Sequence, residues 1–264
     1  MTLAAPVRAF PFRLEQRPTQ AQLIDALAAL LEEHLRRRLA ARGAVKPLGL
    51  ATGRTMEPLY AAVVQRVAAW SETDLNRLRR AWSSFNLDEY LGLPSADPRG
   101  YRHYMDRHLG HPLRLPAGAM HLPDGSSADG QAAAMHYCDA LRKQGGVGLQ
   151  LLGLGSNGHI GFNEPPCRPH LPCRVVQLSD TTRQQNAGMF GGDPGQVPTH
   201  AITLGLQEIL AAEEIHLVVT GAAKAGILRQ LVDTTDPDEH LPASWLRLHQ
   251  RVWLWVDAAA MQPS

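Results

Sequence analysis

A histidine and a glutamate stand five positions apart in the glycine-rich stretch GLGSNGHIGFNEP, residues 153–165. Imidazole and carboxylate groups transfer protons near neutral pH, and glycines let a backbone approach a ligand closely. We therefore predict that His159 and Glu164 are catalytic. Glu164 would sit beside His159, fix the tautomer of its imidazole and favour the protonated form. Gly155 and Gly161 would line the binding site. The alternative is a strand-to-turn junction with a structural histidine.

Two adjacent carboxylates end the apolar stretch FNLDEY, residues 85–90. Like charges side by side repel each other, so one carboxyl group is expected to hold a raised pKa, which suits a general base. We predict Asp88 as this catalytic base and Glu89 as a substrate-binding neighbour. The competing interpretation is a solvated acidic turn.

Two strand–glycine–helix junctions could bind a phosphate. The stretch ATGRT, residues 51–55, combines helix N-terminal N–H groups with a guanidinium that can grip phosphate through two parallel hydrogen bonds. In TGAAK, residues 220–224, the lysine stands early in a helix, where a cation is unfavourable unless an anion offsets it. We predict phosphate contacts from these positions: Thr52, Gly53, Arg54, Thr55 and Lys224. A capped turn and a surface lysine are the alternatives.

The cysteines give no metal or disulfide pattern. Cys167 and Cys173 flank His170, but three such groups at this spacing match no familiar zinc signature, so we expect no metal. The third cysteine, Cys138, leaves an odd number. A sparse, odd cysteine count fits a reducing compartment, and we expect a cytoplasmic protein.

Composition excludes several classes of partner. The chain has 26 Lys and Arg against 25 Asp and Glu, so no global field recruits nucleic acid or a membrane surface. The basic run 34–42 is interpreted as the solvated face of a helix. Residues 1–12 lack the apolar core of a signal peptide, and no stretch is long enough to span a membrane.

Helix-like and strand-like stretches alternate along the chain. Helices are predicted at 19–43, 58–70, 127–144, 207–212 and 222–232, and strands at 45–51, 82–87, 147–155, 215–221 and 251–257. This alternation favours a three-layer αβα sandwich with a mostly parallel, Rossmann-like sheet. The 264 residues, 44% of them hydrophobic, suffice for a single domain. The proline-rich residues 165–174 are expected to be irregular, within a mobile lid-like segment at about 165–193.

Ligands of such sheets bind beyond the carboxyl ends of the strands. Four polar stretches, TGRT, DEY, SNGHIGFNE and TGAAK, each follow a predicted strand. In a parallel sheet they would converge on one crevice. The sequence therefore predicts an enzyme.

These motifs, together with AITLGL and LPASWLRLH, occur in the order found in the glucosamine-6-phosphate deaminase/isomerases. The sequence resembles that family from about Leu48 to Asp257. The resemblance implies a fold of the sugar-phosphate isomerase/lactonase type and a reaction without metal or cofactor. It also implies that His159, supported by Glu164, opens the sugar ring, and that Asp88 moves a proton from C2 to C1 through an enolamine. The products would be fructose 6-phosphate and ammonium.

Two positions depart from the pattern of this family. Some members carry aspartate where Asn157 stands, and another branch has asparagine. The amide of Asn157 can orient His159 but cannot stabilise its cation by full charge, so we expect a lower pKa for His159 than in the aspartate branch. Many members carry a phosphate-binding arginine where Gly188 stands. We expect Arg54 to replace that cation from the opposite wall, with Arg183 as the competing candidate.

Three alternatives remain at this point. Galactosamine 6-phosphate is a second possible substrate after glucosamine 6-phosphate, because the lost arginine and the stretch AITLGLQEIL also resemble that branch. A 6-phosphogluconolactonase would need neither the glutamate of FNEP nor a base at Asp88. A non-catalytic sugar-phosphate sensor would need a DNA-binding helix-turn-helix, and only one main helix precedes Val45. The expected partner is a small molecule, with no nucleic acid and no membrane. A homo-oligomer is possible, because the resemblance covers monomers and hexamers.

Overall fold

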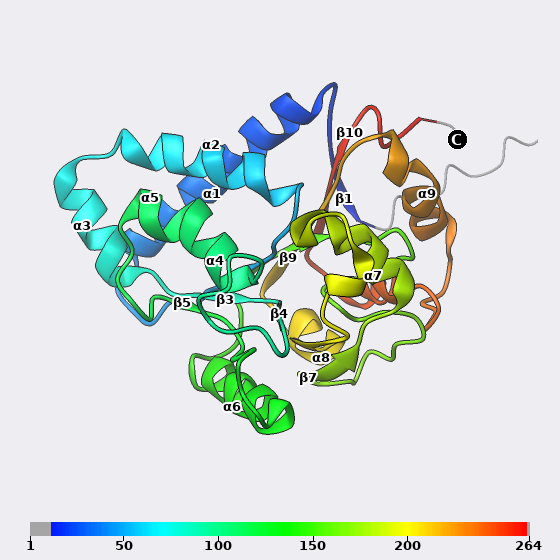
Figure 1. Ribbon diagram of the computed structural model, residues 1–264. Coiled ribbons are helices and arrows are strands. Elements are labelled where there is room, and N and C mark those ends of the chain that lie inside the picture. The colour runs from blue at the N-terminus through cyan, green and yellow to red at the C-terminus, as the bar shows by residue number, and fades with distance from the viewer. Residues whose placement is uncertain (1–11, 263–264) are drawn as a thin grey trace, which may run out of the picture.

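The computed structural model describes residues 12–262, and a seven-stranded sheet runs through its centre (Figure 1). The strand order is β1-β10-β9-β6-β2-β3-β5, and each neighbouring pair runs parallel. The strands are β1 (Arg13–Arg17), β2 (Leu48–Leu50), β3 (Ser84–Asn86), β5 (Met120–His121), β6 (Leu149–Gly153), β9 (Glu214–Val219) and β10 (Val252–Asp257). Helices flank the sheet, which confirms the predicted fold class.

Figure 1 shows α1 and α2 side by side on one side of the strands, and α6 on the other. The longer helices are α1 (Gln20–Ala40), α2 (Met56–Ala68), α3 (Glu72–Ala81), α6 (Gly130–Lys143) and α9 (Ala225–Asp233). The shorter α-helices are α4 (Tyr101–Met105), α5 (His111–Leu113), α7 (Asp180–Asn186) and α8 (Leu206–Leu210). A π-helical turn, η1 (Asp106–Gly110), joins α4 to α5, and the 3₁₀ turns are η2 (Ala187–Phe190), η3 (Pro194–Gln196), η4 (Ala222–Lys224) and η5 (Pro242–Leu248).

Local capping signals set the ends of the long helices. The hydroxyl of Thr19 accepts a hydrogen bond from the backbone N–H of Gln22 at 3.2 Å and starts α1. The carboxylate of Asp129 accepts one from Ala132 at 2.9 Å and starts α6. Gly145, with φ of 82°, follows the end of α6 in a backbone conformation that favours glycine. The predicted helices at 19–43 and 127–144 are therefore present, and each is a few residues shorter than predicted.

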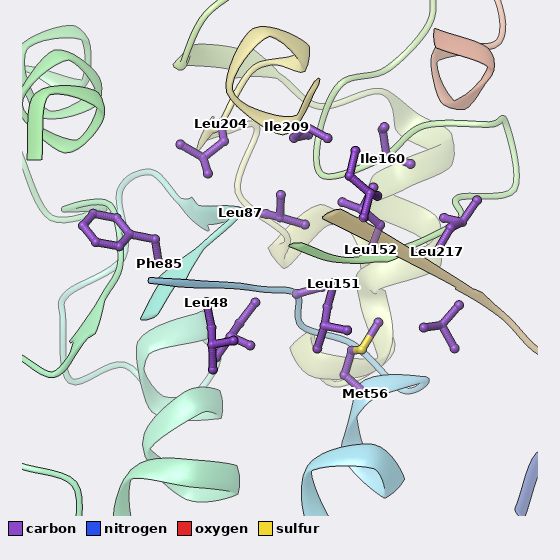
Figure 2. Close-up of a cluster of buried hydrophobic side chains, with 14 of the residues drawn as sticks. Leu48, Met56, Phe85, Leu87, Leu151, Leu152, Ile160, Leu204, Ile209 and Leu217 are labelled. Carbon is purple, nitrogen blue, oxygen red and sulfur yellow. The ribbon is translucent and has the colours of Figure 1, made fainter. Parts of the chain in front are cut away.

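Strand β6 is buried on both faces. Its consecutive residues Leu151 and Leu152 point to opposite sides of the sheet, Leu151 towards Met56 and Leu152 towards Ile160 (Figure 2). All four side chains are fully buried. Burial on both faces explains why the strand is apolar on both sides, with Gln150 as its one polar residue, rather than an alternation of polar and apolar residues.

The stretch DEY is a strand, not a polar turn after one. It forms β4 (Asp88–Tyr90), which pairs antiparallel with β8 (His200–Thr203), and β7 (Arg174–Gln177) completes this three-stranded sheet. The backbone N–H of Leu204 donates to the carbonyl of Leu87 at 2.7 Å and fixes the small sheet to the end of β3. Consecutive side chains of β4 therefore point to opposite faces.

Residues 165–173 contain no helix or strand, as the prolines predicted. The rest of the segment 165–193 forms β7, α7 and η2. In the basic run 34–42, Arg36 and Arg37 are exposed on α1, in keeping with a solvated face. The prediction that the chain begins without a signal peptide falls on residues 1–11, which lie outside the described residues. Within 12–262, no helix is long and apolar enough to cross a membrane.

Candidate active site

A cavity of about 200 Å³ lies beyond the carboxyl ends of β2, β6 and β9. All four polar stretches singled out in the sequence contribute to its wall. The predicted site residues that line it are Thr52, Gly53, Arg54, Thr55, Asp88, Gly155, His159, Gly161 and Lys224. The wall does not include Glu89, Asn157 or Glu164. These three side chains instead contact other groups of the protein.

Asp88 reaches the cavity from β4. Its side chain is 5% exposed, and burial raises the pKa of its carboxyl group to about 8, with a further rise from the charge of Glu89. A Cβ atom on Gly161 would lie 3.5 Å from Oδ2 of Asp88, so the carboxylate borders the backbone of the glycine-rich stretch. A carboxylate with a raised pKa is a stronger base than an ordinary one.

Glu89 faces away from the cavity, which corrects its predicted role as a substrate-binding residue. Its carboxylate accepts three backbone N–H groups, from Tyr90 and Tyr101 at 2.9 Å and from Arg102 at 2.8 Å. Two of these donors belong to the first turn of α4. Glu89 therefore anchors that helix to β4, because the side chains of adjacent strand residues alternate between faces.

Asn157 contacts the imidazole of His159 directly. Its Oδ1 lies 2.6 Å from Nδ1 of His159, and because an amide oxygen only accepts, Nδ1 carries the proton. The lone pair is then on Nε2, which can take a proton. Burial lowers the pKa of His159 to about 4, with a smaller lowering by Lys224 and an opposing effect of Glu164. The imidazole is neutral at physiological pH.

Glu164 does not set the tautomer of His159, so this part of the prediction was wrong. Its carboxylate oxygens both accept the backbone N–H of Ser179, at 3.3 Å. Ser179 is the N-cap of α7. Glu164 therefore acts on His159 through its charge, which is insufficient to outweigh burial, and it fixes the start of α7.

The imidazole rests on Gly155. A Cβ atom at residue 155 would overlap the ring of His159, so the ring can take this position only above a glycine. The backbone N–H of Gly155 also donates to the carbonyl of His159 at 2.9 Å and closes the loop. The glycines in this stretch therefore make room for a side chain of the protein as well as for a ligand.

Two cations face the cavity from different elements. Arg54 is an exposed residue in the loop before α2, and Lys224 is half-buried in η4, directly before α9. Burial lowers the pKa of Lys224. Within residues 12–262, neither side chain takes part in a salt bridge. Both charges are available to an anion in the cavity.

The side chain of Arg54 reaches the backbone of Gly188, and Arg183 does not reach the cavity. A Cβ atom on Gly188 would lie 3.2 Å from Nη2 of Arg54. Arg183 instead donates through Nε to the carbonyl of Val197 at 3.2 Å and through Nη2 to that of Gly195 at 3.4 Å. Arg183 is therefore bound to the backbone of η3 and of the residue that follows it, and is absent from the wall.

The predicted site residues omit Thr220, which belongs to the stretch TGAAK, and three further polar residues of the wall. Tyr101 comes from the first turn of α4, and Gln185 and Asn186 come from the end of α7. The polar run TTRQQN could have drawn attention to the latter pair, because it follows a serine that caps a short helix. Nothing in the local sequence marks Tyr101.

The cysteine pair flanking His170 does not form a metal site. Cys167 and Cys173 are buried, whereas His170 is exposed. No group of three or more His, Cys, Asp or Glu side chains in residues 12–262 is arranged to hold a metal ion. All three cysteines are free.

Known proteins resemble this chain along most of its length. A glucosamine-6-phosphate deaminase of Oceanobacillus iheyensis is 40% identical over 215 residues, which is 81% of this chain and 83% of that protein. Glucosamine-6-phosphate deaminase 2 of Bacillus subtilis is 38% identical over 245 residues, 91% of this chain and 93% of that protein.

Solved structures of known proteins also resemble this chain in fold. A monomeric glucosamine-6-phosphate deaminase superposes with a TM-score of 0.83 at 31% identity, over 95% of this chain and all of the other. A 6-phosphogluconolactonase from Trypanosoma cruzi shares the fold, with a TM-score of 0.73 at 18% identity over 97% of this chain and 98% of the other. Residues 18–255 match the family described as glucosamine-6-phosphate isomerases/6-phosphogluconolactonase. With this match and these relatives, the chain belongs to the glucosamine-6-phosphate isomerase/6-phosphogluconolactonase family.

Proposed function

We propose that this enzyme converts glucosamine 6-phosphate and water into fructose 6-phosphate and ammonia. The observation that carries the proposal is that Asp88 and His159, from different elements, border one cavity. Arg54 and Lys224 also line this cavity, and neither forms a salt bridge within the described residues. Relatives named as glucosamine-6-phosphate deaminases, at about 40% identity, support the substrate.

The phosphate is proposed to bind between the 52–55 loop and Lys224. The N-terminal ends of α2 and α9 both meet the cavity here, and helix N-termini favour an anion through their free N–H groups and dipole. Arg54 would add a bidentate contact from the mouth of the cavity. This assignment gives Arg54 the role that the sequence suggested for it.

Ring opening is proposed to use the free lone pair of His159. Opening a cyclic sugar moves a proton from the hydroxyl at C1 to the ring oxygen. Nε2 can accept the first proton and return it to the ring oxygen, because Asn157 holds the proton of the neutral imidazole on Nδ1. Glu164 lies close enough to stabilise the transient imidazolium by its charge.

Asp88 is proposed to carry out the isomerisation. Its carboxylate would remove the proton at C2 of the open aldehyde while the oxygen at C1 gains a proton, which gives an enolamine. The resulting carboxylic acid would return its proton to C1 as the amino group loses one. The product is a ketimine at C2, which water converts into the ketone and ammonia. Burial of Asp88 favours both steps, because a pKa of about 8 makes the carboxylate a better base and leaves the acid able to donate.

The lactonase alternative is less well supported. Hydrolysis of a lactone transfers no proton from carbon, so it gives Asp88 no task. The lactonase relatives among the solved structures lie near 20% identity and establish the fold alone. Galactosamine 6-phosphate remains the competing amino sugar, since it differs only in the orientation of one hydroxyl group.

One assay separates these possibilities. Purified protein is incubated with glucosamine 6-phosphate, galactosamine 6-phosphate, unphosphorylated glucosamine and 6-phosphogluconolactone, and both ammonia and ketose phosphate are measured. We expect equal amounts of the two products from glucosamine 6-phosphate and little from the unphosphorylated sugar. Lactone hydrolysis without ammonia release would overturn the proposal, as would release of ammonia without ketose phosphate.

Three further expectations accompany this function. We expect the reaction to proceed in a single copy of the chain, because this chain supplies Asp88, His159, Arg54 and Lys224, the groups that the proposed mechanism uses. Segment 165–193 is proposed to close over the bound sugar, since it carries Gln185 and Asn186 to the wall, and substrate should then protect it from proteolysis.

Three buried free cysteines support a cytoplasmic location.

A further inference from the structure

Thr203 lies directly opposite Asp88 in the small antiparallel sheet. The two residues form a pair between β8 and β4. Side chains of directly opposed residues lie on the same face of an antiparallel sheet, close to one another. Asp88 reaches the cavity, whereas Thr203 is fully buried and is not part of the wall. The mechanism proposed above gives Thr203 no role.

The hydroxyl group of Thr203 holds the backbone of the glycine-rich stretch. Its Oγ1 accepts a hydrogen bond from the backbone N–H of Phe162 over 3.2 Å and donates one to the carbonyl of Leu204 over 3.1 Å. Phe162 lines the cavity and stands three residues after His159. One buried side chain therefore connects β8 to the loop that carries the imidazole.

Gly161 lies beside both the Thr203 hydroxyl and the carboxylate of Asp88. A Cβ atom at residue 161 would lie 3.0 Å from Oγ1 of Thr203 and 3.5 Å from Oδ2 of Asp88. The φ angle of Gly161 is 58°, in the left-handed region that favours glycine. The backbone therefore passes close to both side chains, at a position where a larger residue would be crowded and strained.

Asn163 fixes the next residue of the same loop. Its side chain is fully buried, and Nδ2 donates to the carbonyl of Ile160 over 3.0 Å and to that of Leu204 over 2.9 Å. Its Oδ1 accepts a hydrogen bond from Arg174 over 2.9 Å. The strand β8 and its last neighbour thus hold the loop at two successive positions, so the loop is fixed to the sheet that carries the base.

The proposed reaction requires a fixed separation of Asp88 and His159. The imidazole acts on the hydroxyl at C1 and on the ring oxygen, whereas the carboxylate acts on C2 and C1. These atoms lie within two bonds of one another, and misplacement of a catalytic group by about 1 Å can lower the rate about a hundredfold. The carboxylate comes from β4 and the imidazole from the loop after β6, so contacts between these elements must set their separation.

We infer that Thr203 is a positioning residue whose hydroxyl group sets the separation of Asp88 and His159. The pairing of β4 with β8 places Thr203 beside the base. The hydrogen bond from the N–H of Phe162 then places the loop of the imidazole against it. Without this acceptor the N–H would be buried and unpaired, so the loop would shift towards another acceptor or water. The inference rests on the proposed function for the identity of the reaction.

Thr203→Val tests this role, because valine has nearly the shape of threonine and lacks the hydroxyl. We expect kcat for glucosamine 6-phosphate to fall about tenfold or more, while KM stays within about twofold of the wild-type value. Thr203 is not part of the wall, so calorimetry should give the wild-type affinity and stoichiometry for inorganic phosphate. An unchanged stoichiometry shows that the lower kcat does not come from unfolded protein.

Two further substitutions at this position complete the test. Thr203→Ser retains the hydroxyl group and should recover most of kcat. Thr203→Cys, whose thiol is a weak acceptor, replaces Thr203→Val if the valine variant does not fold.

Deuterium at C2 of the substrate shows which step has slowed. A displaced Asp88 removes the C2 proton more slowly, so the isotope effect on kcat in Thr203→Val should equal or exceed that of the wild type. A smaller isotope effect would mean that a different step has become limiting, and it would overturn the inference.

Thr182→Val is the matched control. Thr182 is a second buried threonine, in α7, and its hydroxyl has no hydrogen-bond partner among residues 12–262. The same substitution there should leave kcat unchanged. Wild-type kcat in Thr203→Val, or an equal loss in Thr203→Ser or Thr182→Val, would also overturn the inference.

Failure of the proposed function would be visible separately. A wild-type protein that releases no ammonia from either amino-sugar phosphate would reject that function. Hydrogen exchange of the Phe162 N–H, which needs no substrate, would then test the hold of Thr203 on the loop. This exchange should be faster in Thr203→Val than in the wild type, and an unchanged rate would show that the hydroxyl does not fix the loop.

Discussion

The guanidinium of Arg54 lies against Gly188, with Nη2 3.2 Å from the point that a Cβ atom of residue 188 would occupy. Two segments far apart in the sequence thus share one space near the proposed phosphate site. A large side chain at 188 would compete with Arg54 for that space. The pair is therefore expected to behave as alternatives, with one cation supplied by either position.

Arg54→Ala should raise KM for glucosamine 6-phosphate about tenfold or more with a smaller effect on kcat, because a bidentate contact to a non-reacting phosphate is lost. Steady-state kinetics measure both parameters. Arg183→Ala is the control, since Arg183 binds backbone carbonyls outside the wall. A KM unchanged by Arg54→Ala would reject this role.

Moving the cation should restore binding. Gly188→Arg alone should impair the enzyme, because two guanidinium groups would then crowd one space. In combination with Arg54→Ala, the new arginine should recover most of the lost affinity. If the double variant binds phosphate no better than Arg54→Ala, the two positions are not interchangeable.

Asn157→Asp should raise the pKa of His159 from about 4 towards its ordinary value, because a full negative charge next to Nδ1 stabilises the imidazolium. NMR titration of the imidazole reads this pKa directly. Asn157→Ala removes the contact without adding charge, so it should not produce the same rise. An imidazole that titrates alike in the wild type and the aspartate variant would contradict the assignment.

Glu89→Gln should lower the pKa of Asp88, since it removes the neighbouring negative charge. As a base Asp88 must be ionised, so kcat/KM should rise with pH through about 8 in the wild type. In the variant this rising limb should move to lower pH, because the charge that adds to the effect of burial is gone. A role of Glu89 confined to anchoring α4 would reduce the rate at every pH and leave the midpoint where it was.

Gly155→Ala should displace the imidazole and lower kcat about a hundredfold, because misplacement of a catalytic group by about 1 Å has a cost of that order. Gly226→Ala is the matched control, since a Cβ atom at 226 meets nothing within 4 Å and the residue lies inside α9. Wild-type kcat in Gly155→Ala would show that the ring tolerates a methyl group beneath it.

The sequence was informative where local patterns decide structure. Thr19 and Asp129 start helices as capping residues do, and the apolar run around Leu151 predicted a buried parallel strand. Asp88, on β4 directly after β3, and His159, after β6, then meet at one cavity beyond the carboxyl ends of the parallel strands.

Tertiary partners limited the rest of the prediction. Glu89 was placed in the site because DEY was interpreted as a junction, and only its pairing with β8 shows that its side chain faces away. Glu164 was expected against the imidazole, but Ser179, fifteen residues later, holds it. Tyr101 and Asn186 reach the wall from helices whose placement depends on long-range packing, which no local pattern encodes.

The first strand of the large sheet pairs with the last, Arg13 with Trp253 and Arg17 with Asp257. During synthesis β1 therefore leaves the ribosome long before its partner β10 exists. This edge of β1 must wait until β10 has been made, so the sheet can be completed only after residues 252–257 have left the ribosome. A ribosome stalled shortly before β10 would hold a nascent chain in which β1 still lacks its partner and is exposed to chaperones.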